Sequence, residues 1–182
     1  MGVIVVTGIP GVGKTTVMKR AAEGMDIQFA TFGSVMIDLA KEANLVKDRD
    51  EMRSLSLEQQ KELQIKTAEK VAQMKDVIVD THCTVKTPKG YMPGLPEWVI
   101  KKLNPATIVI VEADPEEIYN RRAKDTSRNR DPDSEEKIAE HQQINRAAAM
   151  AYAALTGATV KIVFNHDNGI DEAVKEVAPV LK

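Results

Sequence analysis

Nine residues near the N-terminus constrain the fold more than any other feature of this sequence. The segment 8–16, GIPGVGKTT, directly follows a short apolar run and precedes a stretch with helical character. It fits the pattern G-x-x-x-x-G-K-S/T, whose glycines let successive backbone N–H groups point at phosphate oxygens at the start of a helix. The residues that match are Gly8, Gly13, Lys14 and Thr15. The pattern predicts a strand, a phosphate-binding loop and a helix, in that order.

Two side chains of this loop and one distant carboxylate predict a metal-dependent phosphate site. Lys14 is placed to reach the β- and γ-phosphates of a nucleotide, and the Thr15 hydroxyl is placed to ligate Mg²⁺. Asp80 ends the buried run VIVD, so we expect it near Thr15, holding the metal through water. A turn or cap role is the alternative for Asp80. A plain strand-to-helix turn would leave the lysine and the threonine unexplained.

Short β-rich runs alternate with helical stretches along the chain. Several runs are continuously apolar, which is typical of strands covered on both faces, as in a parallel sheet wrapped by helices. The sequence therefore predicts an α/β fold. The predicted strands are 2–7, 27–32, 77–81, 107–112 and 159–164.

Helix start signals support the same organisation. Ser56 and Asp114 each stand three residues before a glutamine or glutamate, the spacing of a capping box, and 133–136 is a third such signal. The longest helical pattern covers 134–155, and Gly157 is well placed to end it.

Two segments are predicted as long loops, 82–96 and 125–133, because glycine, proline and polar residues dominate them. Loops of this length in a compact domain are often lids or binding loops. The second loop contains Arg128 and Arg130, and we interpret it as a lid that closes over phosphates. An ordinary solvated loop is the alternative.

Three further arginines have competing interpretations. Arg121 and Arg122 end a predicted helix, where cations interact well with the helix dipole, which accounts for one of them. Arg146 could pair with Glu140 or Asp125 on a solvated face. Guanidinium groups also clamp phosphate oxygens and neutralise the transition state of phosphoryl transfer. This gathering of arginines favours transfer of phosphate between nucleotides.

Composition narrows the class of protein. The chain has 182 residues, 43% of them apolar, a net charge of -2 and a single cysteine, Cys83. These values predict one globular domain in a reducing, cytoplasmic setting, without a disulfide framework, a signal peptide or a membrane span. The small net charge argues against binding of long nucleic acid.

The segment 165–168, NHDN, lacks the lysine of a guanine-binding N-K-x-D motif, so a guanine-nucleotide switch is disfavoured.

Several long motifs resemble those of archaeal adenylate kinases over essentially the whole chain. They are GIPGVGKTT, FGSVM, KDRDEMR, DTHCTVKTPKGYMPGLP, DTSRNRD and NRAAAMAYAALTGATVKIV. The resemblance implies a three-layer P-loop NTPase fold with a five-stranded parallel sheet in the order 2-3-1-4-5 and a short lid. It also implies the Mg²⁺-dependent reaction of ATP with AMP to give two ADP, and a trimeric assembly. Within a single domain, 1–182, the AMP-binding region falls at about 31–75 and the lid at about 124–134.

The resemblance also assigns residues to the ATP half of the site. Arg121 corresponds to an arginine that lies against the ATP adenine, and the loop 165–168 could meet the adenine through its backbone. The catalytic clamp consists of Arg128, Arg130 and Arg146 together with Lys14. The residues assigned to the ATP phosphates are Gly8, Gly11, Val12, Gly13, Lys14, Thr15 and Thr16.

The acceptor half departs from the bacterial pattern. Ile37 stands where the first acceptor arginine of that pattern falls, and DTHCT contains no arginine. We therefore expect other residues to meet the AMP phosphate. Arg53 and Lys86 are the leading substitutes, whereas Arg49 is interpreted as a partner of Asp48 or Asp50. Gly33 and Ser34 are expected near the adenine or ribose, and His82 either approaches the acceptor phosphate or braces its loop.

Two rival functions remain open. A kinase for another nucleoside monophosphate, such as CMP or UMP, would use the same chemistry. A non-catalytic ATP-dependent assembly factor would use the same fold as a switch, but the acidic charge balance counts against it. Among smaller signals, His141 and His166 are predicted at the surface, and Trp98 either packs a helix on the sheet or covers a subunit contact.

Overall fold

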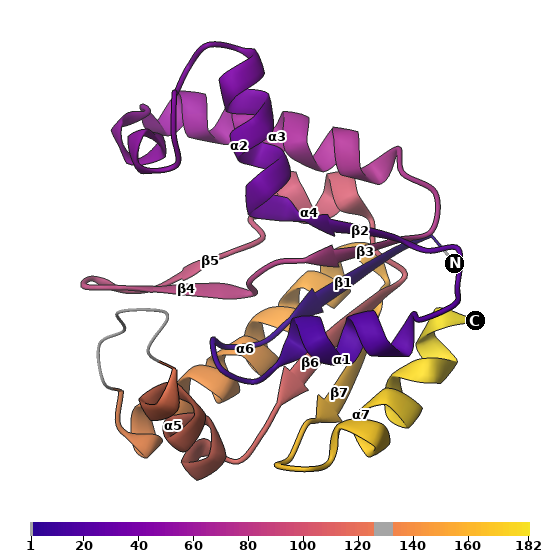
Figure 1. Ribbon diagram of the computed structural model, residues 1–182. Helices are drawn as coiled ribbons and strands as arrows, with labels where there is room; N and C mark the ends of the chain where they lie inside the picture. Colours follow the sequence, from indigo (N-terminus) through magenta and orange to yellow (C-terminus); the bar gives the residue numbers. More distant parts are fainter. Residues whose placement is uncertain (1, 126–132) are drawn as a thin grey trace.

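Figure 1 shows a sheet with helices on both of its faces in the computed structural model, which describes residues 2–125 and 133–182. The strands are β1 (Val3–Thr7), β2 (Gln28–Thr31), β3 (Val77–Asp80), β4 (Thr84–Thr87), β5 (Gly90–Pro93), β6 (Thr107–Glu112) and β7 (Thr159–Phe164). The α-helices are α1 (Lys14–Ala21), α2 (Phe32–Glu42), α3 (Leu57–Ala72), α4 (Glu97–Leu103), α5 (Pro115–Lys124), α6 (Glu135–Thr156) and α7 (Ile170–Val177). There are also short 3-10 helices, η1 (Asp50–Ser54) and η2 (Ala178–Leu181).

The main sheet has five strands in the order β2-β3-β1-β6-β7, and every neighbouring pair in it is parallel. The implied order 2-3-1-4-5 counts only the strands of this sheet, whereas the labels of the structure also number β4 and β5. These two strands form a separate antiparallel pair. The α/β fold and the five strands predicted from the apolar runs are thus confirmed.

The two faces of the sheet carry separate apolar clusters because alternate residues of a strand point to opposite sides. On one face, Val3 and Val5 of β1 pack with residues of α3, α4 and α6. On the other face, Ile4 and Val6 pack with residues of α1, α5 and α7. The central strand β1 is therefore buried on both sides, and all five of its residues are buried, as its continuous apolar run predicts.

Helix ends follow the predicted signals. The Ser56 hydroxyl accepts a hydrogen bond from the Gln59 N–H while the Gln59 side chain accepts one from the Ser56 N–H, a complete capping box. Helix α6 starts after Ser134, one residue later than the signal at 133–136 places it, and Gly157 ends it with a φ of 77°.

The prediction of a loop over 82–96 is wrong in its central part. Residues Thr84–Thr87 and Gly90–Pro93 form a hairpin, with Thr84 opposite Pro93. Its glycine and prolines lie at the turn and at the strand ends, where they do not interrupt pairing. Most of the other predicted loop, 125–133, lies outside the described residues. Within the described part of the chain, no helix combines the length and the apolar character that a bilayer crossing requires.

Candidate active site

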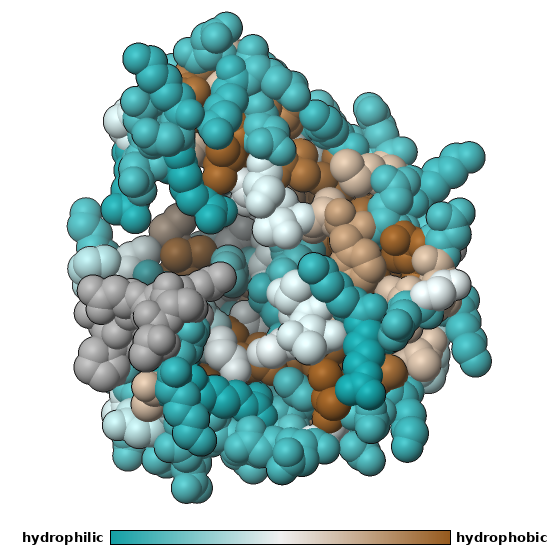
Figure 2. Space-filling view, in the orientation of Figure 1, coloured by the Kyte–Doolittle hydropathy of each residue, from teal (hydrophilic) through white to brown (hydrophobic). Residues whose placement is uncertain are grey.

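A cleft of about 870 Å³ opens at the carboxyl ends of β1 and β3, where the phosphate loop lies. Figure 2 shows a hollow below the region of α2 and α3, with largely hydrophilic surface around it. The predicted site residues that line the cleft are Gly11, Gly13, Lys14, Thr15, Thr16, Gly33, Asp80, His82 and Arg121. Its volume is that of a small-molecule site, and its lining residues come from segments that are far apart in the sequence.

The chemical centre of the cleft is a cluster of Lys14, Thr15 and Asp80. The Asp80 carboxylate forms an ion pair with the Lys14 ammonium through Oδ1 and accepts a 2.8 Å hydrogen bond from the Thr15 hydroxyl through Oδ2. Val6 of β1 lies opposite Asp80 of β3 in the parallel register, so the strand end delivers the carboxylate to the start of α1. The predicted proximity of Asp80 and Thr15 is confirmed.

The phosphate loop depends on a glycine at position 13. Gly13 precedes α1 with a φ of 80°, in the left-handed region that side-chain-bearing residues avoid. A Cβ on Gly13 would lie 2.6 Å from Nδ2 of Asn165. That amide donates a 2.8 Å hydrogen bond to the Val12 carbonyl. The segment that follows β7 therefore supports the phosphate loop through this hydrogen bond from Asn165.

Two residues assigned to ATP support the loop without lining the cleft. The Val12 side chain is 1% exposed and belongs to the apolar core. Gly8 lies where β1 approaches β6, since a Cβ there would be 2.6 Å from the Val111 carbonyl oxygen. Any contact of Gly8 or Val12 with phosphate would come from the backbone.

Arg121 and Arg122 leave α5 in different directions. Arg121 lines the cleft, donates a 2.8 Å hydrogen bond to Asp167 and donates another of 2.9 Å to the Asn165 carbonyl. Arg122 is largely buried and donates a 2.7 Å hydrogen bond to the Pro10 carbonyl. Helix-dipole compensation therefore does not account for Arg122, which supports the phosphate loop directly.

Arg146 has a partner that the sequence did not indicate. Its guanidinium donates two hydrogen bonds, of 2.8 and 2.5 Å, to the carboxylate of Glu112. Glu112 ends β6 and is 2% exposed, and this fork keeps the pKa of Arg146 above its ordinary value. The predicted alternative partners, Glu140 and Asp125, are wrong for Arg146. Arg128 and Arg130 of the predicted lid lie outside the described residues.

The cleft is also lined by an arginine, Arg49, that the sequence analysis interpreted as a partner of neighbouring aspartates. Arg49 lines the cleft, and its guanidinium lies 3.3 Å from the position a Cβ on Gly33 would take. Asp48 instead accepts backbone hydrogen bonds, of 2.9 Å from Asp50 and 3.1 Å from Glu51. In the part of the chain that the structure describes, no ion pair joins Arg49 to either neighbouring aspartate.

Three residues predicted for the acceptor do not line the cleft. Ser34 is exposed on α2, and Arg53 is exposed on η1. Lys86 lies on the hairpin strand β4 and forms an ion pair with Asp133. The sequence does not reveal where the side chains of Arg53 and Lys86 point, because that depends on how η1 and the hairpin pack against the rest of the chain.

Two histidines, one in the cleft and one beside the hairpin, have lowered pKa values. His82 lines the cleft, and its pKa is lowered by loss of hydration there and by the Lys14 ammonium. His141 is 8% exposed, so its predicted surface position is wrong. Its Nε2 lies 3.0 Å from the Thr84 hydroxyl of β4, and burial together with Arg122 lowers its pKa.

Comparisons with known proteins agree with this geometry. A family model described as an AAA domain matches residues 7–139. The chain is 52% identical over 186 residues to an adenylate kinase from Methanopyrus kandleri, covering 99% of this chain and 97% of the relative. It is 51% identical over 185 residues to an adenylate kinase from Methanothermobacter thermautotrophicus, covering both chains completely.

Solved structures of other kinases share the fold. A shikimate kinase from Acinetobacter baumannii in complex with shikimate has a TM-score of 0.62 at 16% identity, covering 100% of this chain and 93% of that one. A shikimate kinase from Bacteroides thetaiotaomicron has a TM-score of 0.60 at 17% identity, covering 99% and 98%. At these identities the likeness concerns the fold alone.

Proposed function

The chain belongs to the adenylate kinase family, and we propose that the cleft described above carries out Mg²⁺-dependent transfer of a phosphoryl group from ATP to AMP, giving two ADP. The observation that carries this proposal is the cluster of Lys14, Thr15 and Asp80 in a cleft that Arg121 and Arg49 also line. Those two arginines give the cleft cationic groups beyond the phosphate loop.

ATP binds along the phosphate loop in this proposal. Backbone N–H groups at the start of α1 surround its phosphates, and the helix dipole favours their negative charge. Lys14 moves from Asp80 to the β- and γ-phosphates, and Arg121 lies against the adenine. The ion pair of Arg121 with Asp167 supports this role because it holds the guanidinium beside the cleft.

Mg²⁺ fits the oxygen atoms that Thr15 and Asp80 bring together. A hydroxyl and a carboxylate 2.8 Å apart are hard donors from two rigid elements, which is the ligand chemistry that Mg²⁺ prefers. Thr15 would hold the ion directly and Asp80 through water. When bound, the ion supplies positive charge that offsets the charge developing on the transferred group.

AMP occupies the region of residues 31–75 in this proposal, with Gly33, Ser34 and His82 nearby. Arg49 is better placed than Arg53 or Lys86 to meet its phosphate, because Arg49 lines the cleft whereas the other two side chains do not. The acceptor phosphate is already anionic, so no general base is needed. Positioning and charge neutralisation then supply the catalysis.

A lid at about 124–134 completes the site, with Arg128 and Arg130 neutralising the migrating phosphoryl group and Arg146 contributing to the same clamp. Arg122 anchors the base of the lid, since it contacts both Pro10 of the phosphate loop and Asp133 at the end of the lid. Closure of such a lid would exclude water and so protect ATP from hydrolysis.

We further propose that residues 1–182 act as one functional unit, located in the cytoplasm and assembled as a homotrimer. Exposed apolar side chains support self-association. Leu57 at the start of α3 is 86% exposed, and Trp98 on α4 is 39% exposed. Trp98 donates a hydrogen bond to Gln64 and lies under the Lys61 ammonium, so its exposed face is held in a fixed orientation.

The first experiment is a turnover assay with ATP, Mg²⁺ and each of AMP, CMP, UMP and GMP, followed by chromatography of the nucleoside diphosphates. We expect AMP-dependent formation of ADP, lost in the variant Lys14→Met. The matched control is Lys19→Met, which removes an exposed lysine of the same helix and should leave turnover unchanged.

Other outcomes would contradict the proposal in different ways. Turnover with CMP or UMP but not AMP would keep the mechanism and change the substrate. Binding of ATP without transfer to any acceptor would favour a non-catalytic ATP-dependent factor.

A further inference from the structure

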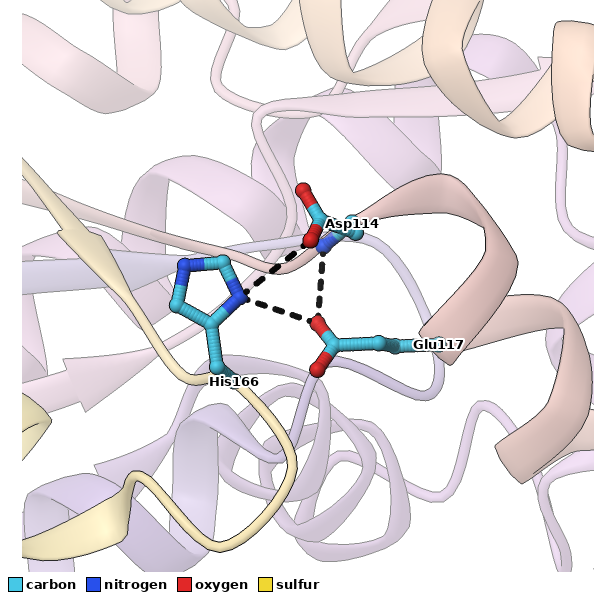
Figure 3. Close-up of side chains that lie close together, drawn as sticks. All are labelled: Asp114, Glu117 and His166. Carbon is cyan, nitrogen blue, oxygen red and sulfur yellow. Dashed lines mark hydrogen bonds and ion pairs between the residues drawn. The ribbon is translucent and has the colours of Figure 1, made fainter.

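Three side chains that do not line the cleft meet where α5 begins and where the chain leaves β7. They are Asp114, Glu117 and His166, drawn in Figure 3. Nδ1 of His166 lies 3.0 Å from Oε2 of Glu117 and 3.5 Å from Oδ2 of Asp114. All three potential ligand atoms lie within 4.8 Å of one another.

These separations match those of a coordination sphere. With metal–ligand bonds of about 2.1 Å, two ligands of a tetrahedral ion stand about 3.4 Å apart. The separations of 3.0 and 3.5 Å around the His166 nitrogen lie on either side of that value. One central cation could therefore contact the three atoms after small side-chain rotations.

Neighbouring groups hold two of the three side chains, Glu117 and His166. Oε1 of Glu117 accepts a 2.6 Å hydrogen bond from the Asp167 N–H, and its Oε2 accepts one of 3.1 Å from the Asp114 N–H. The His166 ring stacks on Phe164, with centroids 5.6 Å apart and planes 5° apart. Outer contacts of this kind orient metal ligands and reduce the entropy that binding costs.

The charge balance of the cluster also calls for a cation. Two carboxylates converge on one imidazole, so the acidic groups of the cluster outnumber its single basic ring. The capping box at the start of α5 accounts for both acids, Asp114 and Glu117, but it requires no imidazole. Asp114 and His166 are about 67% and 48% exposed in their side chains, which leaves room for water molecules to complete a coordination sphere.

We propose that Asp114, Glu117 and His166 form a second divalent-cation site, separate from the Thr15 and Asp80 site, which takes Zn²⁺ or a similar transition-metal ion. An imidazole nitrogen with two carboxylates suits such ions, whereas Mg²⁺ prefers oxygen donors alone. The cation links α5 to the segment after β7. Asp167 of that segment pairs with Arg121, so a bound metal ion restricts the motion of Arg121. Any effect of the metal on nucleotide binding rests on the proposed role of Arg121 at the adenine.

The test measures Zn²⁺ affinity of the full chain by competition with a chromophoric chelator, in excess Mg²⁺ so that the nucleotide site is not available to zinc. We expect one Zn²⁺ per chain. His166→Asn and Asp114→Asn should each weaken binding at least about tenfold, and asparagine at 114 retains the ability to cap α5. Zn²⁺ should raise the melting temperature of the unmodified chain and not that of His166→Asn.

Two matched controls distinguish binding at this cluster from binding at a neighbouring acid or at the nucleotide site. Glu116→Gln removes a neighbouring acid of α5 that lies outside the cluster and should keep full Zn²⁺ affinity. Asp80→Asn removes the carboxylate of the nucleotide site and should also keep it. Equal affinity in His166→Asn and the unmodified chain, or loss of binding in Asp80→Asn alone, would overturn the proposal without bearing on the kinase reaction.

Discussion

The hydroxyl of Thr15 donates a 2.8 Å hydrogen bond to the carboxylate of Asp80, although 65 residues separate them. The contact exists because β1 and β3 are parallel neighbours whose carboxyl ends meet at the same edge of the sheet. The Lys14 ammonium pairs with the same carboxylate. The Thr15 hydroxyl, the Lys14 ammonium and the Asp80 carboxylate are thus in direct contact.

Replacing Asp80 with asparagine should lower kcat by on the order of 100-fold or more, because a preorganised charge at the reacting phosphates is lost. The concentration of Mg²⁺ needed for half-maximal turnover should rise as well. Turnover measured across a Mg²⁺ titration checks both effects. Asp26→Asn, at an exposed aspartate, is the control, and an unchanged Mg²⁺ dependence in Asp80→Asn would contradict the assignment.

Gly13→Ala should impair ATP binding and lower the free energy of unfolding more than alanine does at Gly157. Both glycines have a φ near 80°, so both variants incur backbone strain of about 1 to 2 kcal/mol. The added methyl at position 13 also meets Asn165 at 2.6 Å, whereas nothing lies within 4 Å at position 157. Denaturant unfolding and ATP titration of the two variants measure the difference. Equal losses in both would show that the contact with Asn165 is unimportant.

Arg49→Ala should raise the KM for AMP on the order of tenfold or more while changing the KM for ATP little, because a charge-assisted contact to the acceptor phosphate is lost. Arg53→Ala is the matched comparison, since it removes an exposed arginine four residues away that does not line the cleft. Steady-state kinetics with each nucleotide varied in turn separates the two. A larger effect of Arg53→Ala would restore the interpretation made from the sequence.

The chain should lose stability as the pH falls below about 6.5. The pKa values of His141 and His82 are lowered in the folded protein, chiefly by burial, whereas an unfolded histidine titrates near 6.5. Between the folded and the unfolded pKa the unfolded chain binds more protons, so the free energy of unfolding decreases as the pH decreases. The two histidines make their full contribution to the free energy of unfolding above pH 6.5. This contribution declines as the pH falls toward their pKa values in the folded protein.

Denaturant unfolding at a series of pH values checks this dependence. His141→Gln should reduce the slope between pH 7.5 and 5.5, because the variant no longer has that titrating ring. His82→Gln should reduce it separately, and the two reductions should add because the rings belong to different networks. A slope that neither variant changes would assign the pH dependence to other groups.

The sequence by itself determined the parts of this protein that depend on neighbouring residues. Gly13, Lys14 and Thr15 reveal a phosphate loop because its backbone conformation and its helix start are local properties. The apolar runs reveal the buried strands, and the end of β3 places Asp80, since parallel strands bring their carboxyl ends together. The capping box at Ser56 and the end of α6 at Gly157 are local in the same sense.

The tertiary structure decided which side chains from distant segments meet. Arg49 enters the cleft because η1 and α2 fold over it, and Arg146 meets Glu112 because α6 crosses the end of β6. The burial of His141 depends on the hairpin of β4 and β5, whose pairing is likewise a contact between segments. Patterns of 2 and 3.6 residues specify which face of an element is apolar. They do not specify how two elements pack, and that packing sets the direction in which each of these arginine and histidine side chains points.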